Sequence, residues 1–128
     1  MNEEIVARLQ EEGQKSKEIE ERLEVVDQQL SEMEKFNQVL EGLENRENDE
    51  MLASIGKGVY VKTKLSREDL YVDVGSGVVI NKSMQETKKI IEQQKDKLHA
   101  LKTELNMENE SQNIKLRELI EEIEKDNS

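Results

Sequence analysis

Apolar residues recur at alternating steps of four and three through the first forty residues of the chain. This spacing keeps one stripe of an α-helix apolar, and we call that stripe the seam. Its persistence over five heptads predicts a coiled-coil helix over residues 1–46, ending near Asn45–Asp49 where the pattern is lost. Eight of the eleven seam positions are apolar, and Glu12, Ser16 and Asn37 are the polar ones. The eleven positions are Ile5, Leu9, Glu12, Ser16, Ile19, Leu23, Val26, Leu30, Met33, Asn37 and Leu40.

A second helix is predicted over residues 83–126. Ser83 is a favourable N-cap and Glu86 follows three residues later, which is the spacing of a capping box. After Leu105 one step of four follows another, which is a stutter that locally unwinds a supercoil. Asn109 and Gln112 are polar, so loose contacts are expected there. The predicted seam is Met84, Thr87, Ile91, Gln94, Leu98, Leu101, Leu105, Asn109, Gln112, Leu116, Leu119 and Ile123.

The two predicted helices have similar lengths, about 65 Å each at 1.5 Å per residue. Each must bury its apolar stripe, and the short connection between them favours antiparallel neighbours. Folding the chain at its middle brings Leu40 beside the Met84–Thr87 region and Ile5 beside Ile123, with both chain ends together. We therefore predict an intrachain helical hairpin in preference to helices that pair only between chains or a compact bundle.

Between the helices the hydrophobic period changes from 3.5 to 2, which predicts β-strands. Ser66-Arg67-Glu68-Asp69 is predicted to be a turn between two of them. Residues 55–62 and 74–81 form an internal repeat with a spacing of 19 residues, and each copy contains a Gly-X-Gly triplet. Each copy predicts a β-hairpin whose glycines supply positive φ angles: Gly56, Gly58, Gly75 and Gly77.

The same glycine triplets could in principle bind phosphate. A Walker loop or a dinucleotide fingerprint, however, leads into a helix whose N-terminus faces the phosphate. Here each triplet is followed by strand sequence, so the phosphate interpretation is disfavoured and no cofactor is expected.

Composition narrows the possible functions further. The net charge of −11 argues against nucleic acid as a partner, because phosphate backbones bind clustered Lys and Arg. The chain has no Cys and no membrane-spanning or signal-like segment, so we expect a soluble intracellular protein without disulfides. An enzyme is disfavoured because the only His, His99, is best interpreted as a helix-surface residue. The many carboxylates are best interpreted as solvated helix faces rather than catalytic or metal sites.

Helix, two Gly-X-Gly hairpins and helix, in this order and length, resembles the archaeal-type prefoldin α-class subunit. The most specific stretches are Met51-Leu-Ala-Ser-Ile-Gly-Lys-Gly-Val-Tyr-Val61 and Leu70-Tyr-Val-Asp-Val-Gly-Ser-Gly-Val-Val-Ile80. The resemblance implies a mainly α fold: a long antiparallel coiled-coil hairpin with two tandem β-hairpins at the bend. Residues 1–128 would be one prefoldin-like unit, comprising the N-terminal helix (1–46), the hairpins for assembly (51–82) and the C-terminal helix (83–126).

The resemblance also implies partners and an activity. Two α and four β-class subunits would form a hexamer with a β-barrel body, in the cytoplasm, without a membrane or nucleic acid. The complex would hold unfolded proteins without ATP and pass them to a group II chaperonin. The hairpin residues expected to mediate assembly are Ile55, Val59, Val61, Leu65, Leu70, Val72, Val74, Val78 and Ile80.

Unfolded proteins would be held at the coiled-coil ends. An ATP-independent holdase needs exposed apolar surface that is repeated for avidity. The candidate residues are Ile5, Val6, Leu9, Leu116, Leu119, Ile120 and Ile123. The same residues could equally be buried seam, although Val6 and Ile120 lie beside it and are the better candidates for exposure. The alternative function is a structural coiled-coil spacer or adaptor that oligomerises through its hairpins without binding clients.

Overall fold

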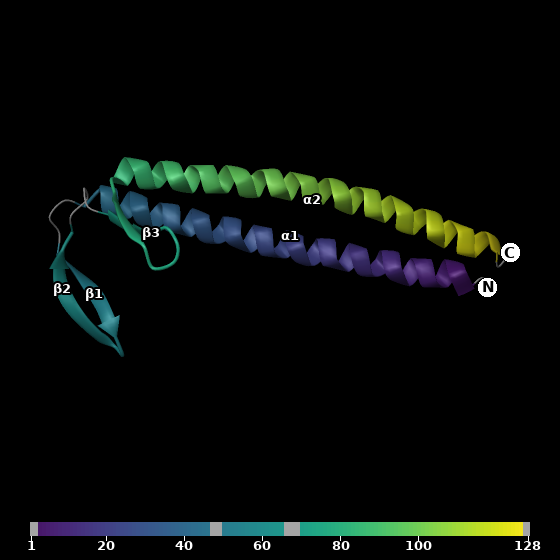
Figure 1. The fold of residues 1–128 in the computed structure, drawn as a ribbon, viewed down its shortest axis with the longest axis horizontal. Helices are drawn as coiled ribbons and strands as arrows, with labels where there is room; N and C mark the ends of the chain where they lie inside the picture. The colour runs from purple at the N-terminus through teal and green to yellow at the C-terminus, as the bar shows by residue number, and fades with distance from the viewer. Residues whose placement is uncertain (1–2, 47–49, 66–69, 127–128) are drawn as a thin grey trace. The chain divides into compact units, whose positions relative to one another are not determined.

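The computed structural model describes residues 3–46, 50–65 and 70–126. The predicted mainly α fold is confirmed: two long helices, α1 and α2, are separated in the chain by two small antiparallel β-hairpins (Figure 1). The elements in order are α1 (Glu3–Glu44), β1 (Glu50–Gly56), β2 (Val59–Lys64), β3 (Leu70–Asp73), β4 (Val79–Lys82) and α2 (Met84–Asp126).

Helix α1 forms because its sequence lacks Pro and repeats an apolar stripe through 42 residues. Glu3 and Glu4 lie in its first turn, where negative charge is favourable beside the positive end of the helix dipole. All eleven predicted seam positions are buried or half-buried, and Val26 and Leu40 are the most deeply buried. The seam of α1 is therefore confirmed. The helix ends at Glu44, and the predicted stop at Asn45–Asp49 lies partly outside the described residues.

Helix α2 begins as the capping signal predicts. The backbone N–H of Glu86 donates to Oγ of Ser83 over 3.1 Å, and the Ser83 hydroxyl donates to Oε1 of Glu86 over 3.2 Å. The backbone N–H of Thr87 donates to the Ser83 carbonyl at 3.0 Å. The Ser83 side chain thus satisfies the Glu86 N–H, which has no partner inside the helix, and the Thr87 bond is the first regular bond of α2.

The chain divides into two compact units, and in each one a part of α1 pairs with a part of α2. The first unit comprises Met1–Ser31 and Asp96–Ser128, and the second comprises Glu32–Lys95. In the first unit Asp27 contacts Lys102, and further back along α1 Glu12 contacts Gln112. The order of these contacts is opposite in the two helices, so the helices run antiparallel. The predicted intrachain pairing is confirmed within each unit.

The second unit contains the hydrophobic core cluster of the fold. Leu40 of α1 is buried together with Met84 and Ile91 of α2, as the fold-back prediction requires for Leu40 and Met84. Leu43 and Leu70 pack against this cluster, and Leu70 is the first residue of β3. One strand of the second hairpin is thereby anchored to the helices by an apolar contact.

The seam of α2 differs from the prediction in its first half. Gln94 and Leu101 were predicted to lie in the seam but are exposed, whereas Lys95 and Lys102 are half-buried in their place. The stutter therefore lies between Ile91 and Lys95 instead of after Leu105. The physical reason is that a lysine buries its aliphatic stem while its ammonium group reaches an acidic residue of α1.

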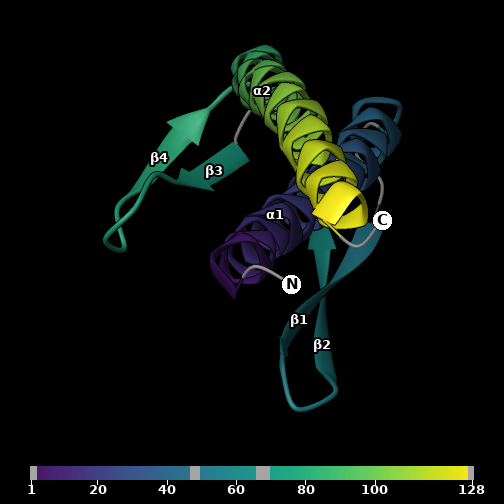
Figure 2. The same cartoon turned by 90° about the vertical axis from the view of Figure 1, so that its right-hand side faces the viewer.

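The two β-hairpins form separate two-stranded antiparallel sheets within the second unit (Figure 2). In the first, Met51 pairs with Thr63 and Gly56 with Val59, with an irregularity in register between Ser54 and Gly56. In the second, the paired residues run from Leu70↔Lys82 to Asp73↔Val79. The predicted turn at Ser66–Asp69 lies outside the described residues. Within residues 3–46, 50–65 and 70–126, neither helix is long and apolar enough to cross a membrane.

Candidate functional site

The hairpin turns have the geometry that the glycine triplets predicted. Gly56, Lys57 and Gly58 all have positive φ angles, of 109°, 51° and 77°. The second triplet repeats this pattern, with 116° at Gly75, 53° at Ser76 and 75° at Gly77. Two successive central residues with positive φ are the signature of a type I′ turn, which suits the right-handed twist of a hairpin. The glycines serve to turn the chain, and each turn leads into a strand.

The strands of both hairpins expose apolar side chains instead of covering them. Leu52, Ile55, Val59 and Tyr60 are more than half exposed in the first hairpin, and Tyr71, Val74, Val78 and Val79 are in the second. An isolated two-stranded hairpin is at best marginally stable in water, and its outer edges offer unpaired backbone groups. Exposed large apolar side chains gathered on two short hairpins are typical of a protein–protein interface.

The nine residues predicted to mediate assembly fall into two groups. Three are half-buried within the chain itself, and one of these, Leu70, belongs to the apolar cluster around Leu40. The other six are exposed and available to another chain: Ile55, Val59, Val61, Val74, Val78 and Ile80. The half-buried residues are Leu65, Leu70 and Val72.

The predicted client-binding residues lie in the first unit, near the start of α1 and the end of α2. Ile120 is 45% exposed, whereas its neighbour Leu119 is only 4% exposed. The remaining five residues are half-buried: Ile5, Val6, Leu9, Leu116 and Ile123. Val6 lies beside the seam but is as buried as the seam residues. Among the seven candidate residues, Ile120 is therefore the most exposed to solvent, and Leu119 is buried.

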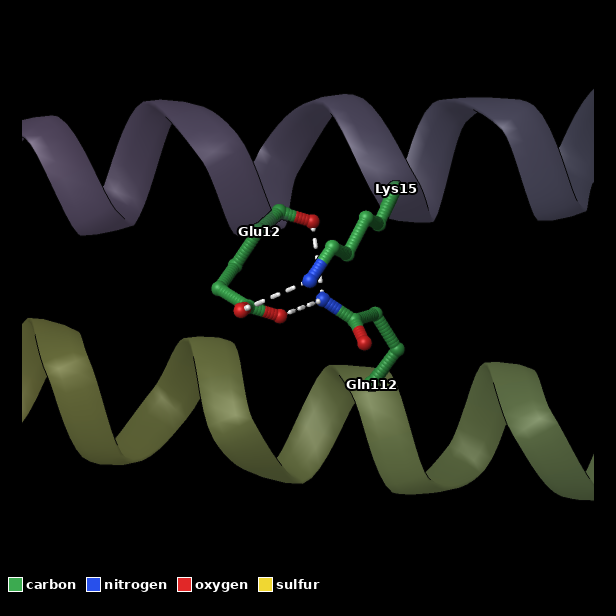
Figure 3. Close-up of polar contacts among 3 residues, drawn as sticks. All are labelled: Glu12, Lys15 and Gln112. Atoms are coloured by element: carbon green, nitrogen blue, oxygen red, sulfur yellow. Dashed lines mark hydrogen bonds and ion pairs between the residues drawn. The ribbon is translucent and has the colours of Figure 1, made fainter.

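A polar layer interrupts the seam of the first unit (Figure 3). The Nε2 atom of Gln112 donates to the Glu12 backbone carbonyl at 2.9 Å and also to the Glu12 carboxylate. On the same side, Nζ of Lys15 lies 3.4 Å from Oε1 of Glu12. The Gln112 hydrogen bond, assisted by the nearby charges of Lys15 and Lys115, lowers the pKa of Glu12 below its usual value, while partial burial acts against this.

Gln112 and Asn109 differ in how their polar atoms are satisfied. Gln112 is buried and hydrogen-bonded to Glu12, so the prediction of loose contacts at this position is wrong. The Oδ1 atom of Asn109 is buried without a hydrogen-bond partner in the described part of the chain. Polar side chains in a seam can select register and partner at some expense of stability.

Three lysines of α2 form a ladder that the sequence prediction missed. Lys88, Lys95 and Lys102 are spaced by seven residues, so they share one face of α2. Each contacts an acidic residue of α1. The Lys95–Glu34 and Lys102–Asp27 distances are 3.0 Å and 2.7 Å, and Lys88 forms a close ion pair with Glu44. The heptad spacing of the lysines was the available signal for this ladder.

A groove of about 510 Å³ opens on the first unit, between α1 and α2. Val26 and Leu105 are its buried apolar residues, and Val25 and Leu101 are exposed in it at 53% and 43%. Leu101 lies in the groove because Lys102 occupies the seam position beside it. The remaining lining residues are polar or charged: Glu18, Glu21, Arg22 and Gln29.

Within the described segments, no three His, Cys, Asp or Glu side chains are grouped so that they could hold a metal ion. His99 is exposed on the surface of α2, in agreement with its interpretation as a surface residue.

Comparison with known proteins agrees with this architecture. Residues 13–127 match the model of the family described as prefoldin subunit. The chain is 30% identical over 93 residues to prefoldin subunit alpha of Methanosphaera stadtmanae, covering 73% of this chain and 67% of that one. It is 27% identical over 81 residues to prefoldin subunit alpha of Methanobrevibacter smithii, covering 62% of this chain and 56% of that one.

Among solved structures, the fold is similar to that of filamentous PFD from Methanocaldococcus jannaschii, determined by cryo-EM. The TM-score is 0.73, and the match covers 94% of this chain and 99% of the other. Sequence identity is 20%, so this likeness concerns the fold alone.

Proposed function

The chain belongs to the prefoldin family as an α-class subunit, and on this premise we propose that it acts in an ATP-independent holdase. Prefoldin is a family of chaperones, and its α subunits assemble into oligomeric complexes. The finer proposal is that this subunit captures unfolded proteins at its coiled-coil ends and that the complex passes them to a group II chaperonin in the cytoplasm.

Assembly through the hairpins is supported by the six exposed apolar residues on their strands and turns. Burying a Val or Ile side chain contributes about 1.5–3 kcal/mol, so several such contacts suffice to hold subunits together. We propose that the partners are β-class subunits, in an α2β4 hexamer whose body is a β-barrel made from the hairpins of all six chains. A closed barrel would also remove the exposed hairpin edges.

Client capture is supported chiefly by Ile120, the one candidate residue that is openly exposed near the end of α2. A single contact of this size is weak, and repetition over several subunits would supply avidity. Acidic residues surround it, since Glu118, Glu121 and Glu122 are all exposed. Their charge would oppose association between the coiled coils themselves.

Removing the coiled-coil ends tests the client-binding proposal. A variant lacking residues 1–9 and 116–128 is assembled with β-class subunits and compared with the full chain for suppression of aggregation of a denatured protein. We expect suppression to be lost, with native mass spectrometry still detecting the hexamer. An assembled variant that suppresses aggregation as well as the full chain would refute binding at these ends.

The alternative function is a structural spacer that assembles through its hairpins and binds no unfolded protein. The polar layer around Glu12 and Gln112 is compatible with it, because such layers serve register and not client binding. It predicts the same oligomer but no suppression of aggregation by the full chain. Native mass measurement of the chain alone and mixed with a β-class subunit tests the assembly shared by both functions, and a monomer in both samples would refute it.

A further inference from the structure

The groove on the first unit leaves Leu101 and Val25 open to solvent although the seam lies next to them. We propose that this groove binds an extended segment of an unfolded polypeptide that carries an apolar side chain and, two or three residues away, a Lys or Arg. The proposal rests on the holdase function and adds a second contact with the client, away from the residues assigned to the coiled-coil ends.

The apolar part of the groove follows from the helix register, in which Lys102 faces the seam and Leu101 does not. Lys102 directs its stem into the seam and its ammonium group to Asp27, at 2.7 Å. Leu101, the next residue, is thereby turned out of the seam and lines the groove with Val25, above the buried side chains of Val26 and Leu105. The groove thus has an apolar floor suited to one aliphatic or aromatic side chain.

Charge selects the rest of the ligand. Residues 18–29 of α1 contain five acidic residues and one basic residue, a net charge of −4. Within the described segments, no ion pair engages the three charged residues that line the groove, Glu18, Glu21 and Arg22. Asp27, by contrast, is already paired with Lys102. Glu18 and Glu21 against Arg22 give the lining a net charge of −1, and this negative charge, on a segment that is itself acidic, favours a cationic side chain in the ligand.

The spacing along α1 sets the spacing in the ligand. Val25 follows Glu21 by four residues and Glu18 by seven, which corresponds to roughly 6 Å and 10 Å at 1.5 Å per residue of helix. An extended chain advances about 3.3 Å per residue, so it covers these distances in two and three residues. An apolar residue over Val25 and Leu101 would therefore place a basic residue two or three positions away beside one of the carboxylates.

A second copy of this chain is a poor occupant of the groove because of its negative charge. The chain has a net charge of −11, and the first fifty residues, which contain one wall of the groove, carry 16 acidic and 6 basic residues. Two such acidic surfaces repel each other, whereas a cationic segment of another protein is attracted.

The absence of cysteine allows a direct test. Gln29 lines the groove, and its neighbour Gln28 is equally a glutamine, is exposed and does not line it. Gln29→Cys and Gln28→Cys are therefore matched reporters, each assembled with cysteine-free β-class subunits. Each is mixed with a peptide that carries an activated disulfide, one Leu, and a Lys three residues from it. The rate of disulfide exchange is then measured.

We expect Gln29→Cys to react about tenfold faster than Gln28→Cys, because binding raises the effective concentration of the peptide. The advantage should disappear when the peptide Lys is replaced by Glu, when its Leu is replaced by Ser, or when Leu101→Gln is added to the protein. Ile114→Gln is the control, since Ile114 is 44% exposed on the same helix, as Leu101 is at 43%, but does not line the groove. That control should leave the advantage intact.

Equal rates at the two reporters would overturn the proposal, as would an advantage that survives Leu101→Gln. Disulfide-linked dimers forming faster from Gln29→Cys than from Gln28→Cys without peptide would assign the groove to a second copy and also overturn it. Aggregation assays on the cysteine-free complex separate the two levels of inference. Failure to suppress aggregation refutes the holdase function, whereas suppression with equal exchange rates refutes only the groove.

Discussion

The Nζ atom of Lys102 on α2 lies 2.7 Å from Oδ1 of Asp27 on α1, and the half-buried lysine faces the seam of α2. Lys102 occupies the position that a simple apolar pattern assigns to Leu101, and Leu101 is exposed as a result. The same substitution of lysine for the expected residue occurs one heptad earlier, where Lys95 contacts Glu34 and Gln94 faces solvent.

Removing the charge of Asp27 should have a small effect on stability. Both partners are partly exposed, with side-chain exposures of 39% for Lys102 and 55% for Asp27, so Asp27→Asn should cost at most about 1 kcal/mol. Lys102→Met keeps an unbranched apolar stem in the seam and should preserve or raise the melting temperature. Thermal unfolding followed by circular dichroism measures both, with Lys97→Met on the exposed face of α2 as control. A large fall in the melting temperature of Lys102→Met, absent in Lys97→Met, would show that the ammonium group and not the stem of Lys102 stabilises the helix pair.

The contact between Glu12 and Gln112 should make the stability of the coiled coil depend on pH. The hydrogen bond from Gln112 lowers the pKa of Glu12 in the folded chain, so the ionised carboxylate stabilises the fold. This stabilisation is fully present above the unfolded-state pKa and is lost as pH falls through the lower folded-state pKa.

Gln112→Leu removes that hydrogen bond, so the variant should lose less stability than the wild type between neutral and strongly acidic pH. Urea unfolding at several pH values in this range gives the free energy of unfolding as a function of pH. The two proteins are compared by how steeply this free energy falls with pH, which does not depend on any change in stability that Leu causes at neutral pH. Identical pH dependence in the two proteins would show that the contact does not shift the Glu12 pKa.

The turn conformations predict opposite effects for two kinds of substitution. Gly58 has a φ of 77° and no neighbouring atom near the position of an added Cβ, so Gly58→Ala acts through backbone conformation alone and should cost about 1–2 kcal/mol. Ser76→Asn should slightly stabilise the second turn, because Asn tolerates positive φ better than Ser. Hydrogen exchange of hairpin amides compares the variants. A neutral Gly58→Ala would contradict the assigned turn.

The start of α2 should depend on its cap. Ser83→Ala removes the acceptor for the Glu86 amide and should destabilise the chain by roughly 1 kcal/mol. Ser111→Ala is a suitable control, because Ser111 is exposed in the interior of the same helix, where alanine is favourable. Chemical denaturation of both variants provides the measurement, and an equal response would mean that the cap does not contribute.

Adjacent residues near the end of α2 should separate stability from client binding. Leu119 is buried, so Leu119→Ala should cost about 2–5 kcal/mol. Ile120 is exposed, so Ile120→Ser should leave the melting temperature nearly unchanged while weakening suppression of aggregation by the assembled complex. Full suppression by Ile120→Ser would remove this residue from the proposed client surface.

The helix pairing could be predicted because its signal is periodic and long. All eleven seam positions of α1 are buried or half-buried, and ten of the twelve of α2 are. The two errors, Gln94 and Leu101, have a common physical cause: a binary pattern treats lysine as polar, although its stem is apolar. Each lysine can bury its stem because an acidic residue of α1 binds its ammonium group, and these pairings are visible only once the two helices are placed side by side.

The candidate surfaces were less predictable than the fold. The Gly-X-Gly repeat indicated both hairpins and their positive φ angles, because few residues other than glycine adopt that conformation. Exposure near the coiled-coil ends was predicted only in part, since Ile120 is exposed, as its place beside the seam indicated, whereas Val6 is half-buried. The groove beside Leu101 was missed altogether, because it follows from the misassigned seam.

Antiparallel pairing within one chain links the lengths of the two helices during evolution. A heptad inserted into α1 within the paired region leaves its new apolar stripe uncovered unless α2 gains a heptad at the matching level. Each matched pair of insertions would lengthen the coiled coil by about 10 Å while leaving the sequence of the hairpins untouched. The length of the coiled coil could therefore change among related subunits in steps of one heptad. Each step would add or remove a heptad in both helices and leave the hairpin segment between them unchanged.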